Sequence, residues 1–167
     1  MVEYIDIVNE NNIVLGPGER NQVHEKRLHH RSVHIFLSNS KGELFIQKRA
    51  KTKKEHPGKY DSSAAGHVDA GEDYDSAAHR ELEEELRIRT ELTYVAKIDA
   101  STETDNEFIH FYTALSDDEI SIDRHEIDDG FFLTISEINR LINSDKSAFT
   151  PAFLLLFKIF TKNIKLK

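Results

Sequence analysis

The sequence predicts an α+β fold in which strands are interspersed with a few helices around one core. Segments of the first half alternate in the manner of strands, residues 74–86 repeat apolar side chains four apart in the manner of a helix, and the tail carries two further helical patterns. The length of 167 residues matches one compact domain, since a chain of about 150 residues buries roughly 70% of its unfolded surface. We therefore expect a single domain spanning residues 1–167.

The composition excludes several classes of protein. With 31% charged residues, no apolar run of bilayer-spanning length and acids near residue 1, we expect neither a membrane span nor a secretory signal. The absence of cysteine removes disulfides, thiolate zinc sites and cysteine nucleophiles. The formal net charge of -8 argues against a nucleic-acid polymer as partner, because phosphate backbones bind basic surfaces. We expect a cytoplasmic enzyme that acts away from membranes.

The first half of the chain reads as two hairpins. Strand-like residues 4–8 and 13–15 flank a turn-rich segment and predict the first hairpin, and the Gly-Pro-Gly of residues 16–18 predicts a break after it. Residues 32–38 and 44–48 predict a second hairpin.

A basic loop follows the second hairpin. Between residues 48 and 59 there are six basic side chains against the single acid Glu55. Such a loop in an acidic protein either attracts a small anion or is a solvated surface loop, and composition alone does not decide between these two interpretations. The basic residues are Lys48, Arg49, Lys51, Lys53, Lys54 and Lys59.

The second half predicts two strands and two helices beyond residue 86. Residues 92–100 and 108–115 are strand-like, and residues 135–142 form an amphipathic helical pattern. Residues 152–160 are apolar on nearly every side, which indicates a buried helix. We place that helix in the core, with the interface of a homodimer as the alternative.

Residues 74–86 form the helix with the most chemical content. Asp73 is a suitable N-cap, and Glu81, Glu84 and Glu85 are spaced three and four residues apart on one side. Charged residues in helices usually face water, but like charges at this spacing repel unless a cation lies between them. Carboxylate oxygens suit Mg²⁺ or Mn²⁺. The helix therefore predicts a divalent metal site.

The metal site belongs to a longer pattern of fixed spacing. Gly66 is followed after five residues by Glu72, after seven more by Arg80 and Glu81, and then by the pair at 84 and 85. This pattern over residues 66–88 resembles the Nudix box, which identifies the chain as a member of the Nudix hydrolase family. The resemblance implies an α/β/α sandwich, with a mixed β-sheet between helices and the box as a loop–helix–loop at the active site.

The resemblance also assigns roles to the residues of the box. It implies that Glu72 and Arg80 pair to hold the loop on the helix. It implies metal ligation by four groups, which are the carbonyl of Gly66 and the carboxylates of Glu81, Glu84 and Glu85. These roles agree with phosphoryl chemistry, because hydrolysis of a diphosphate requires its oxygens neutralised and a water activated. The catalytic candidates are Glu81, Glu84 and Glu107.

One box position departs from the family pattern. Arg87 stands where the family usually has glycine. Arginine in a left-handed conformation costs about 1–2 kcal/mol more than glycine, so either this residue is strained or the helix continues through it.

The region before the box is similar to type I isopentenyl-diphosphate isomerase. The cues include the turn at residues 39–42 and segments 48–50 and 57–58, and the similarity covers about residues 24–110. It implies that Lys48, Arg49, Lys53 and Lys54 hold the substrate diphosphate. It also implies that His24, His30, His67 and Glu107 form a possible second metal site, although a structural role is the commoner one for any single histidine.

A departure from the isomerases favours hydrolysis. Those enzymes require a cysteine before the Gly-His pair for proton transfer at an alkene, and here that residue is Ala65. Alanine carries no proton to donate, and the isomerases also lack the full set of box glutamates. We therefore predict a Mg²⁺-dependent hydrolase of a small-molecule diphosphate, either a nucleoside diphosphate derivative or another small organic diphosphate. Isomerisation is the runner-up, and a binding module without catalysis is the third alternative.

The sequence leaves the organic part of the substrate open. Tyr60, Phe108 and Tyr112 are able to stack on a ligand, but aromatic residues in strand patterns are more often part of the core.

Overall fold

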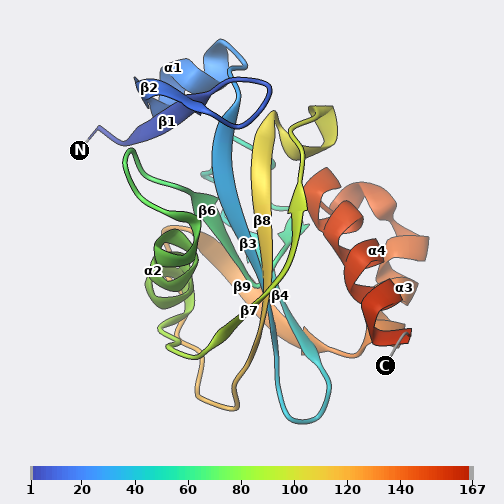
Figure 1. The fold of residues 1–167 in the computed structure, drawn as a ribbon. Helices are drawn as coiled ribbons and strands as arrows, with labels where there is room; N and C mark the ends of the chain where they lie inside the picture. Colours follow the sequence, from blue (N-terminus) through green and yellow to red (C-terminus); the bar gives the residue numbers. More distant parts are fainter. Residues whose placement is uncertain (1, 166–167) are drawn as a thin grey trace.

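A computed structural model describes residues 2–165 of the chain, without the side chains of 164 and 165, and shows a mixed β-sheet with helices on both faces (Figure 1). The predicted α+β class and the sandwich implied by the Nudix resemblance are confirmed. The strands are β1 (Tyr4–Val8), β2 (Val14–Glu19), β3 (His30–Ser38), β4 (Leu44–Arg49), β5 (Tyr60–Asp61), β6 (Ala64–His67), β7 (Leu92–Ile98), β8 (Glu107–Leu115) and β9 (Ile127–Leu133). The helices are α1 (Arg20–Glu25), α2 (Tyr74–Leu86), α3 (Ile135–Ser144) and α4 (Pro151–Lys165), with short 3₁₀ turns η1 (Thr102–Thr104) and η2 (Lys146–Ala148).

Strand β3 organises the main sheet. It pairs in parallel with β8 along its whole length, and on its other side it pairs antiparallel with β6 near its start and with β4 at its end. Strand β7 continues the sheet beyond β8, while β5 and β9 pair with β4. Because β6 and β4 share one side of β3, the sheet opens between them, and this opening borders the candidate site described below.

Two apolar layers hold the helices on the sheet. Side chains on β3 alternate between its faces, so Val33 and Ile35 pack toward α2 whereas Phe36 packs toward α4 (Figure 1). Leu82 of α2 and Phe153 of α4 are fully buried against these two faces. Each such side chain contributes about 1.5–3 kcal/mol by leaving water. The residues that precede Phe36 on the same face of β3 are polar, and they lie beyond the apolar layer under α4. They are His30, Ser32 and His34.

Helix α2 has the bounds that its apolar spacing predicts. The Asp73 carboxylate accepts the Ser76 backbone N–H at 2.9 Å, as an N-cap does. The helix ends at Arg87, which adopts a left-handed conformation with φ 59°. The helix therefore does not continue through Arg87, and this residue takes the strained conformation that the departure from glycine made possible.

The predicted break at residues 16–18 is wrong. Strand β2 runs through Gly16, Pro17 and Gly18 and pairs with β1, where Pro17 lies opposite Asp6. A proline is tolerated there because β1 and β2 form a separate two-stranded sheet, in which β2 has no second neighbour to which its missing N–H would donate. The first predicted hairpin is therefore confirmed but is longer than expected.

Helix α4 belongs to the core, although it is not buried on nearly every side as its composition indicates. Phe153, Leu156 and Phe157 are buried against the sheet, whereas Leu154 and Leu155 are only half-buried. None of the helices among residues 2–165 is long and apolar enough to cross a membrane.

Candidate active site

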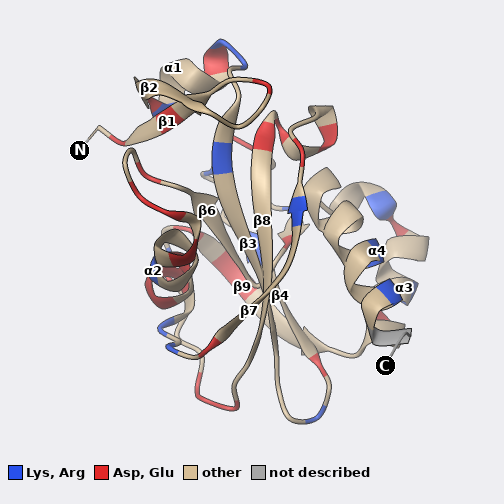
Figure 2. Cartoon of the chain, viewed as in Figure 1, with Lys and Arg blue, Asp and Glu red and all other residues tan. Residues whose placement is uncertain are grey.

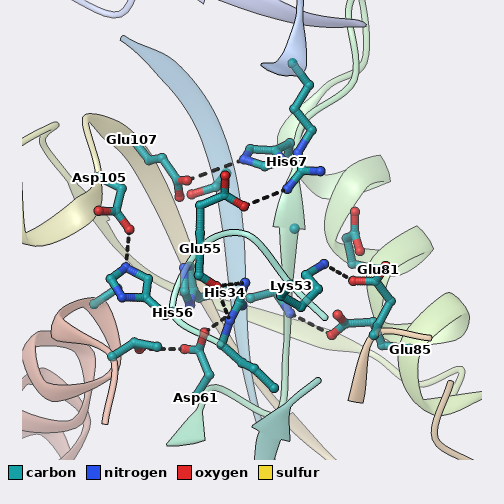
Figure 3. A pocket seen from close by; sticks show the side chains of 18 of the residues that line it. His34, Lys53, Glu55, His56, Asp61, His67, Glu81, Glu85, Asp105 and Glu107 are labelled. Atoms are coloured by element: carbon teal, nitrogen blue, oxygen red, sulfur yellow. Dashed lines mark hydrogen bonds and ion pairs between the residues drawn. The ribbon is translucent and has the colours of Figure 1, made fainter. Parts of the chain in front are cut away.

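A polar pocket of about 380 Å³ lies at the open end of the sheet, where α2, β3, β6 and the basic loop meet (Figure 3). Eleven acidic side chains line it, against four from lysine or arginine. Such an excess of negative charge repels an anionic ligand unless cations enter with it.

The box glutamates reach this pocket from α2. Figure 2 shows acidic positions along α2 and along the loop before it. Glu85 is buried and accepts hydrogen bonds from the Gln47 amide at 2.9 Å and from the Ala65 backbone N–H at 3.0 Å. Glu81 is partly buried and Glu84 is exposed, and both line the same pocket. The sequence therefore placed three carboxylates correctly on one side of the helix.

Arg80 ties the box loop to the helix. Its guanidinium donates to both carboxylate oxygens of Glu72, at 3.0 and 2.8 Å, and to the carbonyl of His67 at 3.0 Å. It also donates to Glu81 at 2.6 Å and to Glu84 at 3.3 Å. The expected Glu72–Arg80 pair is present. Contrary to the sequence argument, the same arginine also relieves part of the repulsion between Glu81 and Glu84, because i,i+4 spacing brings it within reach of the latter.

Gly66 lies directly against Glu81. A Cβ atom at residue 66 would overlap the carboxyl group of Glu81, so glycine leaves room for this carboxylate in its present position. This contact brings the backbone of Gly66 beside the box carboxylates, which fits the metal-ligand set that the resemblance implies.

Burial opposes charge on the two inner glutamates. It raises the pKa of Glu85 well above its usual range, and the nearby Glu81 carboxylate raises it further. The pKa of Glu81 is also raised, chiefly by burial, although Arg80 acts in the opposite direction. A divalent cation between them would reverse both effects, since it favours the ionised carboxylates. The donor set therefore fits Mg²⁺ or Mn²⁺.

Four residues far apart in the sequence converge at the other end of the pocket. One ligand atom from each of His24, His30, His67 and Glu107 lies within 4.8 Å of all the others. Helix α1 supplies His24, β3 supplies His30, β6 supplies His67 and β8 supplies Glu107. The parallel register of β3 and β8 places His30 opposite Glu107. The four residues of the possible second metal site therefore lie together, as expected.

The tautomer of His30 makes this cluster a fitting cation site. Its Nδ1 lies 2.9 Å from the Leu28 carbonyl oxygen, which only accepts, so the Nδ1 carries a proton and donates. In the neutral ring, Nε2 then presents a lone pair to the Glu107 carboxylate oxygen 3.4 Å away, and this buried nitrogen has no hydrogen-bond partner among the described residues. Two acceptors facing each other are stabilised by a cation between them.

The pKa values of the other two histidines are shifted in opposite directions. Burial lowers the pKa of His24 to about 4, and the neighbouring His67 contributes in the same direction. For His67, burial also acts to lower the pKa, but hydrogen bonds to the Glu107 and Glu3 carboxylates outweigh it and raise the pKa to about 9. The Nε2 atoms of His24 and His67 lie 3.0 Å apart, within hydrogen-bond distance of each other.

The basic loop contributes two of its four predicted phosphate-binding residues to the pocket. Arg49 and Lys53 line it, whereas Lys48 and Lys54 do not. Lys48 lies on the opposite face of β4 from Arg49 and stacks over the Tyr60 ring, because neighbouring strand residues point to opposite sides. Lys54 is exposed and donates to Asn21 at 2.9 Å. Of the four residues predicted to bind phosphate, the structure places only Arg49 and Lys53 at the pocket.

Several pocket residues come from segments to which the sequence gave no role, among them Arg20, Asp105, Asp123 and Glu126. Arg20 begins α1 and forms an ion pair with Glu55 at 3.3 Å. Asp123 and Glu126 lie in the loop before β9, and Glu126 pairs with Lys53. The high density of acids between residues 117 and 129 was the only signal for this loop. It reaches the pocket because β9 pairs with β4, which the sequence did not predict.

The match to known proteins agrees with this geometry. The model of the NUDIX domain matches residues 28–153, a stretch that contains the box and most of the pocket. The chain belongs to the Nudix family. An uncharacterised Nudix hydrolase of Yersinia pestis is 42% identical over 88 residues, which are 53% of this chain and 48% of that protein.

Two further relatives align with most of this chain. An isopentenyl-diphosphate Δ-isomerase of Photorhabdus laumondii is 30% identical across 92% of this chain and 89% of its own. The crystal structure of DR0079 from Deinococcus radiodurans superimposes with a TM-score of 0.75 at 29% identity, covering 86% of this chain and 90% of its own. The predicted resemblance to both the Nudix hydrolases and the isomerase-like branch is therefore confirmed.

Proposed function

We propose that this Nudix protein hydrolyses the phosphoric anhydride bond of a small organic diphosphate with the help of Mg²⁺ or Mn²⁺. The observation that carries the proposal is the convergence of Glu81, Glu84 and Glu85 on a pocket that also holds Arg49 and Lys53. Bound between the carboxylates and the diphosphate, the cations would neutralise the phosphate oxygens and acidify the attacking water.

The protein's own groups perform the remaining tasks. Arg49 and Lys53 hold the phosphate oxygens, and Arg80 with Glu72 positions the box loop against the helix. The water oxygen forms a bond to one phosphorus while the bridging P–O bond breaks, so that one diphosphate and one water yield an organic phosphate and inorganic phosphate. The water proton passes to a carboxylate, for which Glu81 and Glu107 are the two candidates, and the leaving phosphate oxygen is reprotonated from solvent.

The pocket favours hydrolysis over isomerisation. Ala65 lines the pocket where the isomerases have their cysteine, and its methyl group neither donates nor accepts a proton. The chain contains no thiol that would substitute. The similarity to the isomerases supports a shared diphosphate-binding end, and the full set of box glutamates supports a different reaction there.

Phosphate release from organic diphosphates in the presence of Mg²⁺ tests the proposal. We expect Glu81→Gln to lower kcat by about 100-fold or more, because it removes a ligand and a candidate base. Glu83→Gln is the matched control on the same helix. Glu83 pairs with the exposed Arg89 and does not line the pocket, so its substitution leaves turnover unchanged. Equal turnover by wild type and Glu81→Gln would contradict the proposal.

The binding-module alternative gives a different result in the same assay. A module without catalysis would be stabilised against heat by Mg²⁺ and further by the diphosphate, and would leave the diphosphate intact. Conversion of isopentenyl diphosphate to its isomer without phosphate release would favour the isomerase instead.

A further inference from the structure

Polar and charged side chains make up most of the pocket lining. Among the described side chains that line it, only Ala65 and Ala152 are apolar, and no phenylalanine, tyrosine, leucine, isoleucine or valine is among them. The three aromatic candidates of the sequence lie elsewhere. Phe108 and Tyr112 are buried, and Tyr60 packs against Phe149. A prenyl chain would find no wall of apolar side chains here, and a nucleobase would find only imidazole rings and none of the larger aromatic rings among the described residues.

The wall facing away from the box glutamates is instead made of hydrogen-bonding groups. Figure 3 places His34, His56, Asp61 and Asp105 on this side, across the pocket from Glu81 and Glu85. Several of their atoms are already engaged. Asp61 accepts from Arg49 at 3.1 Å and from the Thr150 hydroxyl at 2.9 Å, and His56 bonds Asp105 at 2.6 Å. These bonds fix the side chains in place, so the wall is preorganised.

Two side chains on this wall retain an unused hydrogen-bonding atom. His34 is 5% exposed and its Nδ1 lies 2.7 Å from the Ser62 hydroxyl, which leaves Nε2 without a partner among the described residues. Ser32 is 2% exposed, and its hydroxyl has no partner there either. Both lie on the face of β3 that lines the pocket, two residues apart, as strand alternation requires. The buried Ser32 hydroxyl without a partner costs about 1–3 kcal/mol, which a ligand group would recover.

We infer that the organic part of the substrate is a small hydroxylated group, a sugar or an open-chain polyol, whose hydroxyls bond the wall of His34, Asp61 and Asp105. This inference rests on the proposed function and names its substrate class. A hydroxyl both donates and accepts, which matches a wall that mixes imidazoles with carboxylates. Asp61 and Asp105 disfavour a second phosphate at this position, because their carboxylates accept hydrogen bonds and a phosphate has few to donate. The cavity of about 380 Å³ is at the small end of ligand pockets.

Two compounds that differ only in hydroxyl groups give the cleanest test. Glyceryl and n-propyl methylenebisphosphonates cannot be hydrolysed, so their binding in the presence of Mg²⁺ is measurable by calorimetry whether or not the protein is a hydrolase. We expect the glyceryl compound to bind wild type about 10-fold more tightly or better, since a site built for hydroxyls rejects the analogue that lacks them. A ribose 5-methylenebisphosphonate distinguishes a sugar ring from an open chain.

Substitution of His34 links this preference to the wall. In His34→Phe we expect the ratio of the two affinities to fall toward one, while His34→Gln, which keeps a polar group near the Nε2 position, restores part of it. His110→Phe is the matched control, because His110 lies on β8 outside the pocket and stacks on Tyr74. It should leave the ratio unchanged.

The outcomes separate this inference from the proposed function. Equal or tighter binding of the propyl compound would overturn the inference, as would a preference for the corresponding cytidine or isopentenyl bisphosphonates. Failure to bind any of the compounds would overturn it too. A preference for glyceryl without hydrolysis of glyceryl diphosphate would keep the inference and remove the hydrolase.

Discussion

At the scale of single residues, the end of helix α2 is held in an unfavourable conformation. Arg87 has φ 59°, and its backbone N–H donates to the Glu83 carbonyl as the C-terminal cap of α2. An arginine in the left-handed region crowds its own Cβ against the following carbonyl, which glycine avoids. The family pattern has glycine at this position, so the strain is specific to this chain.

We predict that Arg87→Gly stabilises the protein. The expected gain is about 1 kcal/mol in the free energy of unfolding, because the relief of left-handed strain outweighs the added entropy of glycine in the unfolded chain. Urea denaturation measures this gain as a higher midpoint with an unchanged slope. Arg87→Ala is the control, since alanine removes the same charge and keeps the Cβ. A similar gain from both variants would assign the effect to charge rather than to strain.

At the scale of elements, the sequence predicted those helices and strands whose signals lie within one short segment of the chain. Helix α2 was predicted with its bounds and its N-cap because apolar spacing and Asp73 lie within a few residues of each other. Strands β6 and β9 were not predicted, because β6 is a short pairing with β3 and β9 is held by β4 from far along the chain. The same long-range pairings bring Asp123 and Glu126 to the site.

The possible second metal site also depends on contacts between distant segments, which spacing in the sequence does not reveal. Nothing in the spacing of His24, His30, His67 and Glu107 indicates that they meet, since four different elements carry them. Only the resemblance to a family of known fold placed them together. The structure places Lys48 and Lys54 outside the pocket. Their position in the basic loop does not specify to which side each side chain points.

The basic loop is attached to the rest of the molecule through a bond that depends on pH. His56 Nε2 lies 2.6 Å from the Asp105 carboxylate, and this hydrogen bond is the main reason that the pKa of His56 is raised above 6.5. A raised folded-state pKa means that the stabilisation is fully present below the unfolded value and is lost as the pH rises through the folded one.

We therefore predict that His56→Gln destabilises the protein more at pH 5.5 than at pH 9. The difference should be about 0.5–1 kcal/mol, since both partners are partly exposed and screened by solvent. Unfolding by urea at the two pH values measures it. Asp105→Asn removes the same ion pair from the other side and should abolish the same pH dependence. A loss of stability that is equal at both pH values would indicate packing rather than the charge on His56.

At the scale of the whole molecule, negative charge is concentrated where the fold brings distant segments together. The chain carries a formal net charge of -8, and eleven acidic side chains border one pocket. Repulsion among buried or partly buried carboxylates lowers the stability of the folded state. Divalent cations that bind only the folded pocket would remove this cost, so metal binding and folding are coupled.

This coupling predicts opposite effects of Glu81→Gln with and without metal. Without divalent cations, the variant should melt at a higher temperature than wild type, because an amide costs less to bury than the Glu81 carboxylate and its oxygen still accepts from Arg80. With Mg²⁺ or Mn²⁺ it should gain less than wild type, which is stabilised by about 2.7 kcal/mol for each site once the cation is at 100 times its dissociation constant. His67→Gln should reduce the gain separately if the histidine cluster binds its own cation. Melting curves in NaCl of equal ionic strength control for screening, and an equal rise in NaCl and MgCl₂ would show that no cation is held specifically.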